Sequence, residues 1–219
     1  MNTALPTDYQ NFIAISRYAR WMDNEQRRET WSETVSRYVD FLASRTNMDT
    51  DTTEEIWDAI YKLEVMPSMR ALMTAGAALD RDNTAGYNCA YLPVDDMKSF
   101  DEAMYILLCG TGVGFSVERD NVTKLPDIPS QLQKGEDMLV VQDSKEGWAK
   151  ALRKLIALLY AGEIPSWDLS KIRPAGARLR TFGGRASGPA PLDNLFNFTV
   201  NLFKENEGKK LSGYDCHSL

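Results

Sequence analysis

The sequence contains a single histidine and three cysteines among 219 residues, and this scarcity removes several kinds of site. It holds no Cys-x-x-Cys pair, no Ser-His-Asp set and no paired catalytic carboxylates. His217 has only Cys216 beside it as a possible companion ligand, so we expect no metal site. An odd number of cysteines argues against a disulfide framework. It favours thiols kept reduced, which predicts a cytoplasmic protein.

Long apolar runs and an excess of basic residues are also missing. The longest apolar runs, at 104–108 and 155–160, are far shorter than a membrane span, and the first ten residues show no signal-peptide pattern. The net charge of −6 argues against a general nucleic-acid binder. We therefore expect neither membrane nor nucleic acid as a partner. With 43% apolar and 26% charged residues, the chain has the composition of an ordinary globular protein.

One stretch, residues 170–192, runs against this acidic background because it holds five basic residues and no acidic one. The basic residues are Lys171, Arg173, Arg178, Arg180 and Arg185, and glycines 176, 183, 184 and 188 lie among them. Glycine allows the backbone to approach an anion closely, and arginine binds phosphate oxygens in pairs. The pattern indicates a phosphate-binding loop. A solvated basic turn is the alternative, and composition alone favours it.

Helical periodicity and capping residues predict an α-rich chain whose first part is almost entirely helical. The predicted helices are 9–22, 30–43, 51–63, 99–108, 143–159 and 192–205, with the start of another at 212–215. We expect Ser99 to cap the fourth of these, and Asp143 with Glu146 to form a capping box for the fifth. The N-terminal helices are amphipathic and should pack on one another without carrying chemistry.

Strands are predicted at 88–92 and 115–117, separated by the predicted helix and a glycine-rich turn at 109–114. Residues 119–142 are predicted to form an irregular surface segment. The order helix, glycines, strand is the reverse of the dinucleotide-binding order, so we reject a Rossmann domain. The turn serves either the close approach of a flat ligand or a tight reversal without one. Cys89, taken alone, is more often a buried core residue than a redox thiol.

Taken in order, the motifs resemble the catalytic subunit of ribonucleotide reductase, and most of all its adenosylcobalamin-dependent (class II) type. The matching segments are RYARW at 17–21, ETWSETV at 29–35, MPS at 66–68, NCA at 88–90, GTGVGFSV at 110–117, EGW at 146–148, DLSKIRPAG at 168–176 and FGGRASGPAPL at 182–192. The last is the most specific. The likeness covers nearly the whole chain from about Tyr9 and favours a redox role for Cys89.

The resemblance implies an α/β fold in which N-terminal helices precede the first part of a ten-stranded α/β barrel, incomplete in this chain. It implies thiyl-radical reduction of a ribonucleotide at C2′, with Cys89 as one member of the cysteine pair that becomes a disulfide. The residues that the resemblance assigns to the substrate are Ser68, Asn88, Gly110, Thr111, Gly112 and Gly114. Those that it assigns to a deoxynucleoside triphosphate effector are Asp96, Arg173, Arg178, Arg180, Gly183, Gly184 and Arg185.

We expect two regions, a helical one at 1–65 and a barrel part at 66–219. The family's radical cysteine, its second redox cysteine and most of its barrel have no counterpart here. The expectation is therefore one chain of a split enzyme, active only when a second polypeptide supplies the C-terminal half; an intein-split half or a cut sequence is the alternative.

The implied cofactor is adenosylcobalamin, held mainly by the missing part, or none in this chain if a diiron subunit generates the radical. A thioredoxin-like reductant and homodimerisation are further expectations. The choice between di- and triphosphate substrates stays open. The rival hypothesis is a non-catalytic regulatory module that binds deoxynucleotides.

Overall fold

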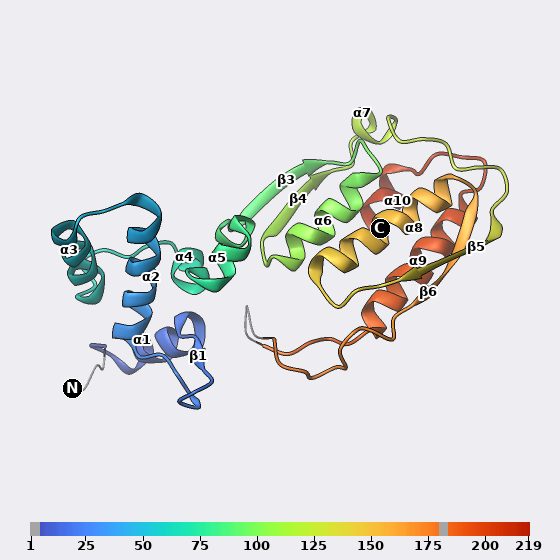
Figure 1. Ribbon diagram of the computed structural model, residues 1–219. Coiled ribbons are helices and arrows are strands. Elements are labelled where there is room, and N and C mark those ends of the chain that lie inside the picture. The colour runs from blue at the N-terminus through green and yellow to red at the C-terminus, as the bar shows by residue number, and fades with distance from the viewer. Residues whose placement is uncertain (1–4, 180–183) are drawn as a thin grey trace. The chain divides into compact units, whose positions relative to one another are not determined.

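The computed structural model describes residues 5–179 and 184–219, which form two compact units (Figure 1). The first, here called the helical unit, holds the chain up to Asn88 together with Leu179 and Gly184. The second, the α/β unit, holds Cys89–Arg178 and Arg185–Leu219. The sequence-based division after residue 65 stays a prediction.

The helical unit consists of helices and one short hairpin. Its elements are α1 (Asp8–Ile13), the π-helix η1 (Ala14–Tyr18), β1 (Trp21–Met22), β2 (Arg27–Arg28), α2 (Trp31–Thr46), α3 (Thr50–Tyr61), α4 (Met69–Thr74), α5 (Ala77–Arg81) and the 3₁₀-helix η2 (Asn83–Gly86). Helix α2 begins with a capping box, in which Thr30 Oγ1 accepts from Glu33 N at 3.3 Å and Thr30 N donates to Glu33 Oε2 at 2.7 Å. The helix ends at Asn47, whose backbone adopts the left-handed conformation.

A small apolar core and one buried ion pair hold the helical unit together. The core contains Ala14, Trp31, Val35, Val39, Ile60 and Leu72. Arg37 Nε binds Glu29 Oε1 at 2.8 Å, with side-chain exposures of only 17% and 9%. The same guanidinium donates to the carbonyl oxygens of Tyr18, Leu72 and Ala75. One arginine on α2 therefore satisfies backbone acceptors of two other segments, the end of η1 and the end of α4, as a buried charge requires.

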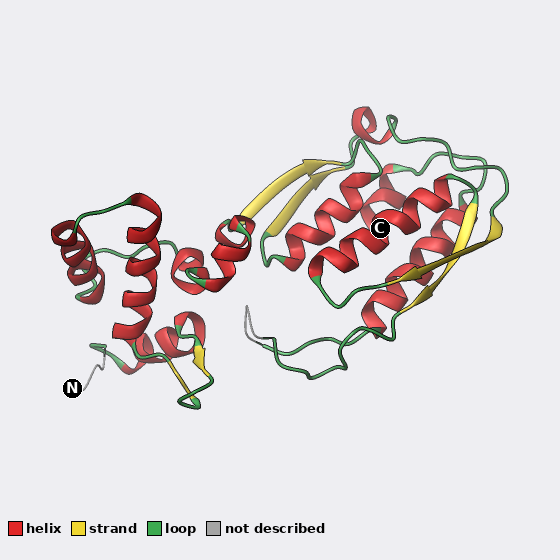
Figure 2. Cartoon of the chain, viewed as in Figure 1, coloured by secondary structure: helices red, strands yellow, loops and turns green. Residues whose placement is uncertain are grey.

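The α/β unit is built from two parallel strand pairs, each joined by a helix (Figure 2). Its elements are β3 (Cys89–Pro93), α6 (Lys98–Leu108), β4 (Gly112–Ser116), α7 (Arg119–Val122), β5 (Gln133–Val140), α8 (Lys145–Tyr160), β6 (Glu163–Asp168), α9 (Ala190–Glu205) and α10 (Gly213–Ser218). Strands β3 and β4 pair in parallel, as do β5 and β6. The α/β class is confirmed. The described residues hold pairs of strands and no barrel, so the barrel stays a prediction.

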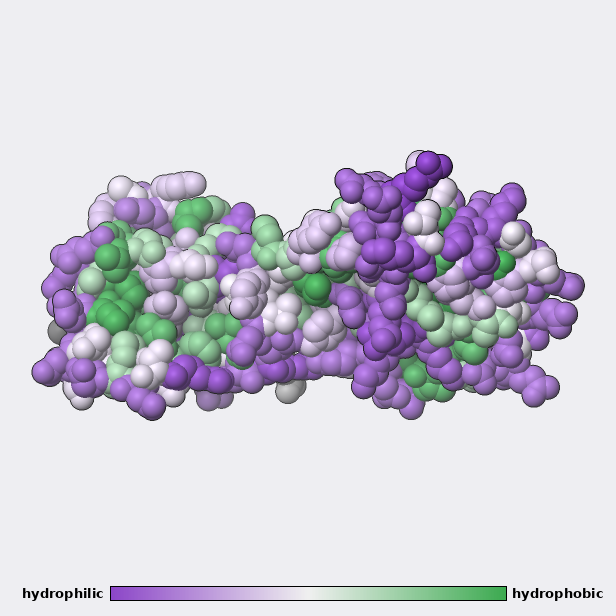
Figure 3. Space-filling model, turned by 90° about the horizontal axis from the view of Figure 1, so that it is seen from above, coloured by the Kyte–Doolittle hydropathy of each residue, from purple (hydrophilic) through white to green (hydrophobic). Residues whose placement is uncertain are grey.

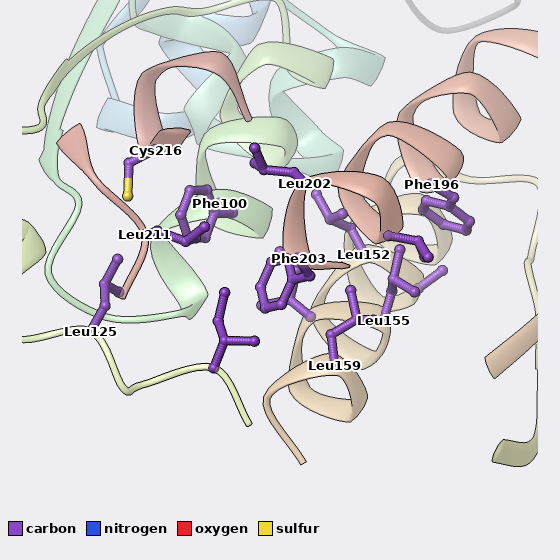
Figure 4. Packing of buried hydrophobic residues seen from close by; sticks show 14 of the residues in the cluster. Phe100, Leu125, Leu152, Leu155, Leu159, Phe196, Leu202, Phe203, Leu211 and Cys216 are labelled. Atoms are coloured by element: carbon purple, nitrogen blue, oxygen red, sulfur yellow. The ribbon is translucent and has the colours of Figure 1, made fainter. Parts of the chain in front are cut away.

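The core of the α/β unit lies between its helices (Figure 4). Phe196 and Phe203 of α9 and Leu155 and Leu159 of α8 are each fully buried. The ring of Phe203 makes an edge contact with Tyr160, at 4.9 Å between centroids. This packing follows from the helical spacing of apolar residues seen in the sequence. No helix among the described residues has the length and apolarity needed to cross a membrane.

Several predicted elements are wrong in detail. Residues 119–142 are not irregular throughout, because they contain β5. Only Leu139 of this strand is buried, so its sequence is mostly polar and lacks the apolar pattern of a strand. The first predicted helix ends early, since Ala19 is extended and leads into the β1–β2 hairpin. Ser99 does not cap α6; its hydroxyl donates to Pro93 O at 2.9 Å. The cap of α8 is Ser144, whose Oγ accepts from Gly147 N, instead of Asp143.

Candidate functional site

Cys89 differs from the other two cysteines because its side chain is exposed. Cys109 and Cys216 are buried, with 0% and 3% exposure. Burial, and to a smaller extent the negative charge of Asp215, raises the pKa of the Cys216 thiol to about 11. A thiol held protonated is a poor nucleophile. Cys89 is therefore the cysteine that a substrate or a reductant can reach directly.

The parallel register of β3 and β4 sets the surroundings of Cys89. Cys89 lies opposite Gly112, and Tyr91 lies opposite Gly114. Side chains alternate between the two faces of a sheet, so these four residues share one face. Leu92, on the other face, is buried against the helices. Beside Cys89, strand β4 consequently presents bare backbone.

The glycine at 114 is not required by packing. A Cβ built there would meet its nearest neighbour, Ala90 O, at 3.8 Å, an ordinary van der Waals distance. Its φ is not among the positive ones either. Gly110 is different, because its φ of 81° lies in the left-handed region and lets the chain turn from α6 into β4. Glycine at 110 is therefore explained by its backbone conformation, whereas the missing side chain at 114 leaves space on the face that carries Cys89.

The other residues assigned to the substrate have mixed positions. Thr111 has 1% exposure, so its side chain belongs to the turn. Asn88 directly precedes Cys89 and is exposed. Ser68 belongs to the helical unit, where it is the N-cap of α4 and its hydroxyl oxygen accepts from Ala71 N at 3.5 Å. The structure brings together Cys89, Gly112 and Gly114; the assignment of Ser68 stays a prediction.

The described residues on either side of 180–183 in the basic stretch pair in antiparallel fashion, and this paired region is called the basic turn. Ala186 N donates to Ala177 O at 2.7 Å, Gly176 N donates to Ala186 O at 2.9 Å, and Arg178 pairs with Arg185. Directly opposed residues carry their side chains on the same face, so both arginine side chains leave the backbone on one face of this pair. Arg185 also donates to Gly176 O at 3.0 Å.

The remaining effector assignments have four different outcomes. Arg173 Nε forms an ion pair with Asp143 Oδ2 at 2.7 Å, which ties the start of the basic stretch to the segment before α8. Asp96 Oδ1 accepts from Lys98 N at 2.8 Å at the beginning of α6. Gly184 has a φ of 87° and open space where a Cβ would stand. Arg180 and Gly183 lie outside the described residues.

Two features of this region carry no signal in the sequence. Asp143 is the partner of Arg173 across 30 residues. Lys145 contacts the thiol of Cys109 across 36 residues. Local patterns do not encode such long-range contacts. In the part of the chain that the structure describes, no group of three or more His, Cys, Asp or Glu side chains could hold a metal ion.

Comparison with known proteins finds matches to the family that the motifs resemble. The family described as the ribonucleotide reductase alpha domain matches residues 3–77. The family described as the insertion domain of B12-dependent ribonucleotide reductase matches residues 116–202. Together the two matches account for most of the chain.

Relatives and a solved structure agree with these matches. An adenosylcobalamin-dependent ribonucleoside-triphosphate reductase from Lactobacillus helveticus is 27% identical over 92% of this chain and 37% of its own length. One of the same name from Euglena gracilis is 28% identical over 91% of this chain and 30% of its own. The crystal structure of a B12-dependent (class II) ribonucleotide reductase superposes with a TM-score of 0.82 at 25% identity, covering 93% of this chain and 38% of that one. The chain spans between 30% and 38% of the length of these proteins.

Proposed function

Because this chain belongs to the ribonucleotide reductase family and resembles the N-terminal part of its adenosylcobalamin-dependent type, we propose that it takes part in reducing ribonucleotides to deoxyribonucleotides. Cys89 supplies one of the two thiols that are oxidised to a disulfide as the 2′ carbon is reduced. A thiyl radical elsewhere in the completed enzyme starts the reaction at the 3′ position. A thioredoxin-like protein then returns the disulfide to thiols, which suits a reducing compartment such as the cytoplasm.

The observation that carries this proposal is the open face of the β3–β4 pair. Cys89 is exposed there, and its neighbours across the register are glycines, one of which packing does not demand. A ribose can approach a thiol closely only where no side chain stands beside it. Without side chains at 112 and 114, a substrate can also approach the backbone of β4 on this face. Cys109 and Cys216 lack this access because they are buried.

The basic turn supports binding of a deoxynucleoside triphosphate as an effector. Arg178 and Arg185 lie opposite each other, and a triphosphate between them would offset their repulsion. Arg173, with its ion pair to Asp143, fixes the start of this turn. Asp96 would serve the sugar of the same ligand.

The remainder of the reductase is the proposed principal partner, supplied as a separate polypeptide. Parallel sheets occur almost only where both faces are covered. Yet Tyr91 of β3 is 68% exposed and Met138 of β5 is 60% exposed. Figure 3 shows apolar residues breaking the polar surface of the chain in several places. A C-terminal half that covers these strands would complete the barrel and bring the second redox cysteine to Cys89. Homodimerisation through such surfaces is a further part of the proposal.

Adenosylcobalamin is the cofactor that the relatives' names imply. An apolar groove of about 440 Å³ in the α/β unit, lined in part by Leu92, Val113 and His217, is too small to enclose a corrin ring with its nucleotide tail. We therefore propose that the rest of the enzyme binds the cofactor. No step assigned to this chain depends on it.

The deciding experiment joins the chain to a C-terminal half from a relative's reductase by co-expression. Size exclusion reports association, and reduction of cytidine di- and triphosphate is measured with and without adenosylcobalamin. Co-elution with cobalamin-dependent activity supports the proposal and identifies the substrate. Activity that needs a diiron subunit instead would overturn the cofactor assignment.

The rival function, a regulatory module that only binds deoxynucleotides, is favoured by the basic turn. It predicts that the chain alone is monodisperse and binds a deoxynucleoside triphosphate while never supporting reduction with any C-terminal half. Replacing Arg178 and Arg185 by alanine should abolish that binding under either hypothesis. A Cys89→Ser change separates the two, because only the reductase needs the thiol.

A further inference from the structure

A second cysteine site lies in the α/β unit, away from the open face that carries Cys89. Lys145 Nζ donates to Cys109 Sγ at 3.0 Å, which is within hydrogen-bond distance for sulfur. The same ammonium lies 4.7 Å from the centre of the Tyr105 ring, a cation–π contact that holds it over the end of α6. Cys109 is the C-cap of α6, and Lys145 is the first residue of α8.

The placement of Lys145 is unusual for a helix. A cation at a helix N-terminus opposes the macrodipole, which favours negative charge there. A neighbouring cation stabilises a thiolate, the form of cysteine that reacts with oxidants. Here the cation is a primary amine whose nitrogen lies 3.0 Å from the sulfur, so the two atoms are close enough to bond once the sulfur is oxidised.

We propose that Cys109 and Lys145 form a reversible oxidative cross-link, a sulfenamide, when the protein meets hydrogen peroxide. The Cys109 thiolate attacks peroxide, the O–O bond breaks, and sulfur becomes a sulfenic acid while hydroxide leaves. The hydroxide takes a proton from the Lys145 ammonium and becomes water. The neutral amine then attacks the sulfenic sulfur, forming the S–N bond and releasing a second water. Sulfur is oxidised by two electrons, and one peroxide is reduced to two waters.

The bond would tie the end of α6 to the start of α8 directly beside the glycine turn. Gly110, which is exposed, follows Cys109 immediately and leads into β4. Hydrogen peroxide is small and uncharged, so local opening of this exposed turn is enough to admit it. If the proposed function holds, the cross-link would fix the strand that faces Cys89 and make substrate access sensitive to peroxide. The cross-link itself does not depend on that function.

The test uses the full chain with Cys89→Ser and Cys216→Ser, so that Cys109 is the only thiol and no intramolecular disulfide can form. After peroxide treatment and quenching with catalase, intact mass is measured before and after dithiothreitol. The expected result is a loss of about 2 Da, two hydrogens, that dithiothreitol reverses. Peptide mapping should join the peptides that contain Cys109 and Lys145.

The matched variant is Lys145→Arg in the same background, which keeps the charge and removes the amine. It should show no loss of two hydrogens, and its cysteine should proceed to sulfinic acid. Circular dichroism confirms that both variants are folded. The proposal is overturned if Cys109 only gains oxygen in the parent, or if the mass loss persists in Lys145→Arg, which would assign the bond to a backbone nitrogen.

Discussion

Cys89 and Gly112 lie directly opposite each other in the parallel register of β3 and β4, so the one exposed cysteine faces a residue without a side chain. The next pair on the same face is Tyr91 and Gly114. Strand β4 therefore borders the thiol with backbone alone. This relationship requires both strands to be in register and is the geometric basis for proposing that substrate approaches here.

The first prediction concerns Gly114→Ala. A methyl group at 114 fits the fold, since its nearest neighbour would lie at 3.8 Å, but it projects from the same face as Cys89, where we propose that substrate approaches. We expect the free energy of unfolding to change by less than about 1 kcal/mol. In the completed enzyme, kcat/KM should fall at least about tenfold, equivalent to about 1.4 kcal/mol of transition-state stabilisation.

Gly162→Ala is the matched control for this prediction. Gly162 follows α8 with a φ of 92° and lies outside the proposed site. Alanine there should lower the free energy of unfolding by about 1–2 kcal/mol, because its Cβ is strained in the left-handed region. The kcat/KM of the folded enzyme should stay unchanged. Equal kinetic losses in the two variants would show that Gly114 acts through stability alone.

A second prediction tests the thiols directly. In the native chain, iodoacetamide should label Cys89 first, because Cys109 and Cys216 are buried. In the completed enzyme, Cys89→Ser should reduce thioredoxin-supported turnover to background, since a single remaining thiol cannot form the disulfide. Cys216→Ala, a change in the core, should retain turnover. Near-normal turnover of Cys89→Ser would remove the redox assignment.

The amphipathic helices were predictable from the sequence because their information is local. Thr30 and Glu33 form the capping box of α2, and the apolar spacing of α8 gives its buried face. Strand β6 was missed because its six residues, EIPSWD, contain a proline and little alternation. Its partner β5 is polar for the most part, since one parallel pair with an exposed face needs few buried residues. These two strands are stabilised by their pairing with each other, which the local sequence pattern does not reveal.

The candidate site was predictable in part, and through resemblance more than through chemistry. The likeness pointed to Cys89 and the glycines of 110–114, and their register then showed that they are neighbours. The partners Asp143 and Lys145 were missed because each contact joins residues 30 or more apart. Ion pairs at such separation depend on how helices pack, which a single sequence does not reveal.

A third prediction concerns the stability of the helical unit in acid. Hydrogen bonds from Arg27, and next from Thr30 N, lower the pKa of Glu33 from 4.5 to about 2. A lowered pKa in the folded state means that the carboxylate stabilises the fold fully above pH 4.5. This contribution declines as the pH falls toward 2.

Glu33→Gln should therefore lower the free energy of unfolding at neutral pH and flatten its decline between pH 4.5 and 2. The effect should be modest, because Arg27 and Glu33 are 39% and 36% exposed and solvent screens the pair. Chemical denaturation across this range measures it. Glu55→Gln, at an exposed position of α3, is the control. An unchanged acid profile in Glu33→Gln would show that the capping box contributes no pH-dependent stability.

The last prediction concerns the core of the α/β unit. Phe203 of α9 has 0% exposure and packs against Tyr160, whereas Phe198 on the same helix is 41% exposed. Phe203→Ala should lower the free energy of unfolding by about 3–5 kcal/mol, because it removes buried contacts and leaves a cavity. Phe198→Ala should change it by less than about 1 kcal/mol. Urea denaturation followed by tryptophan fluorescence measures both. A similar loss in the two variants would mean that a partner or a second copy covers Phe198 in solution, so the measurement also tests the exposed surface of α9.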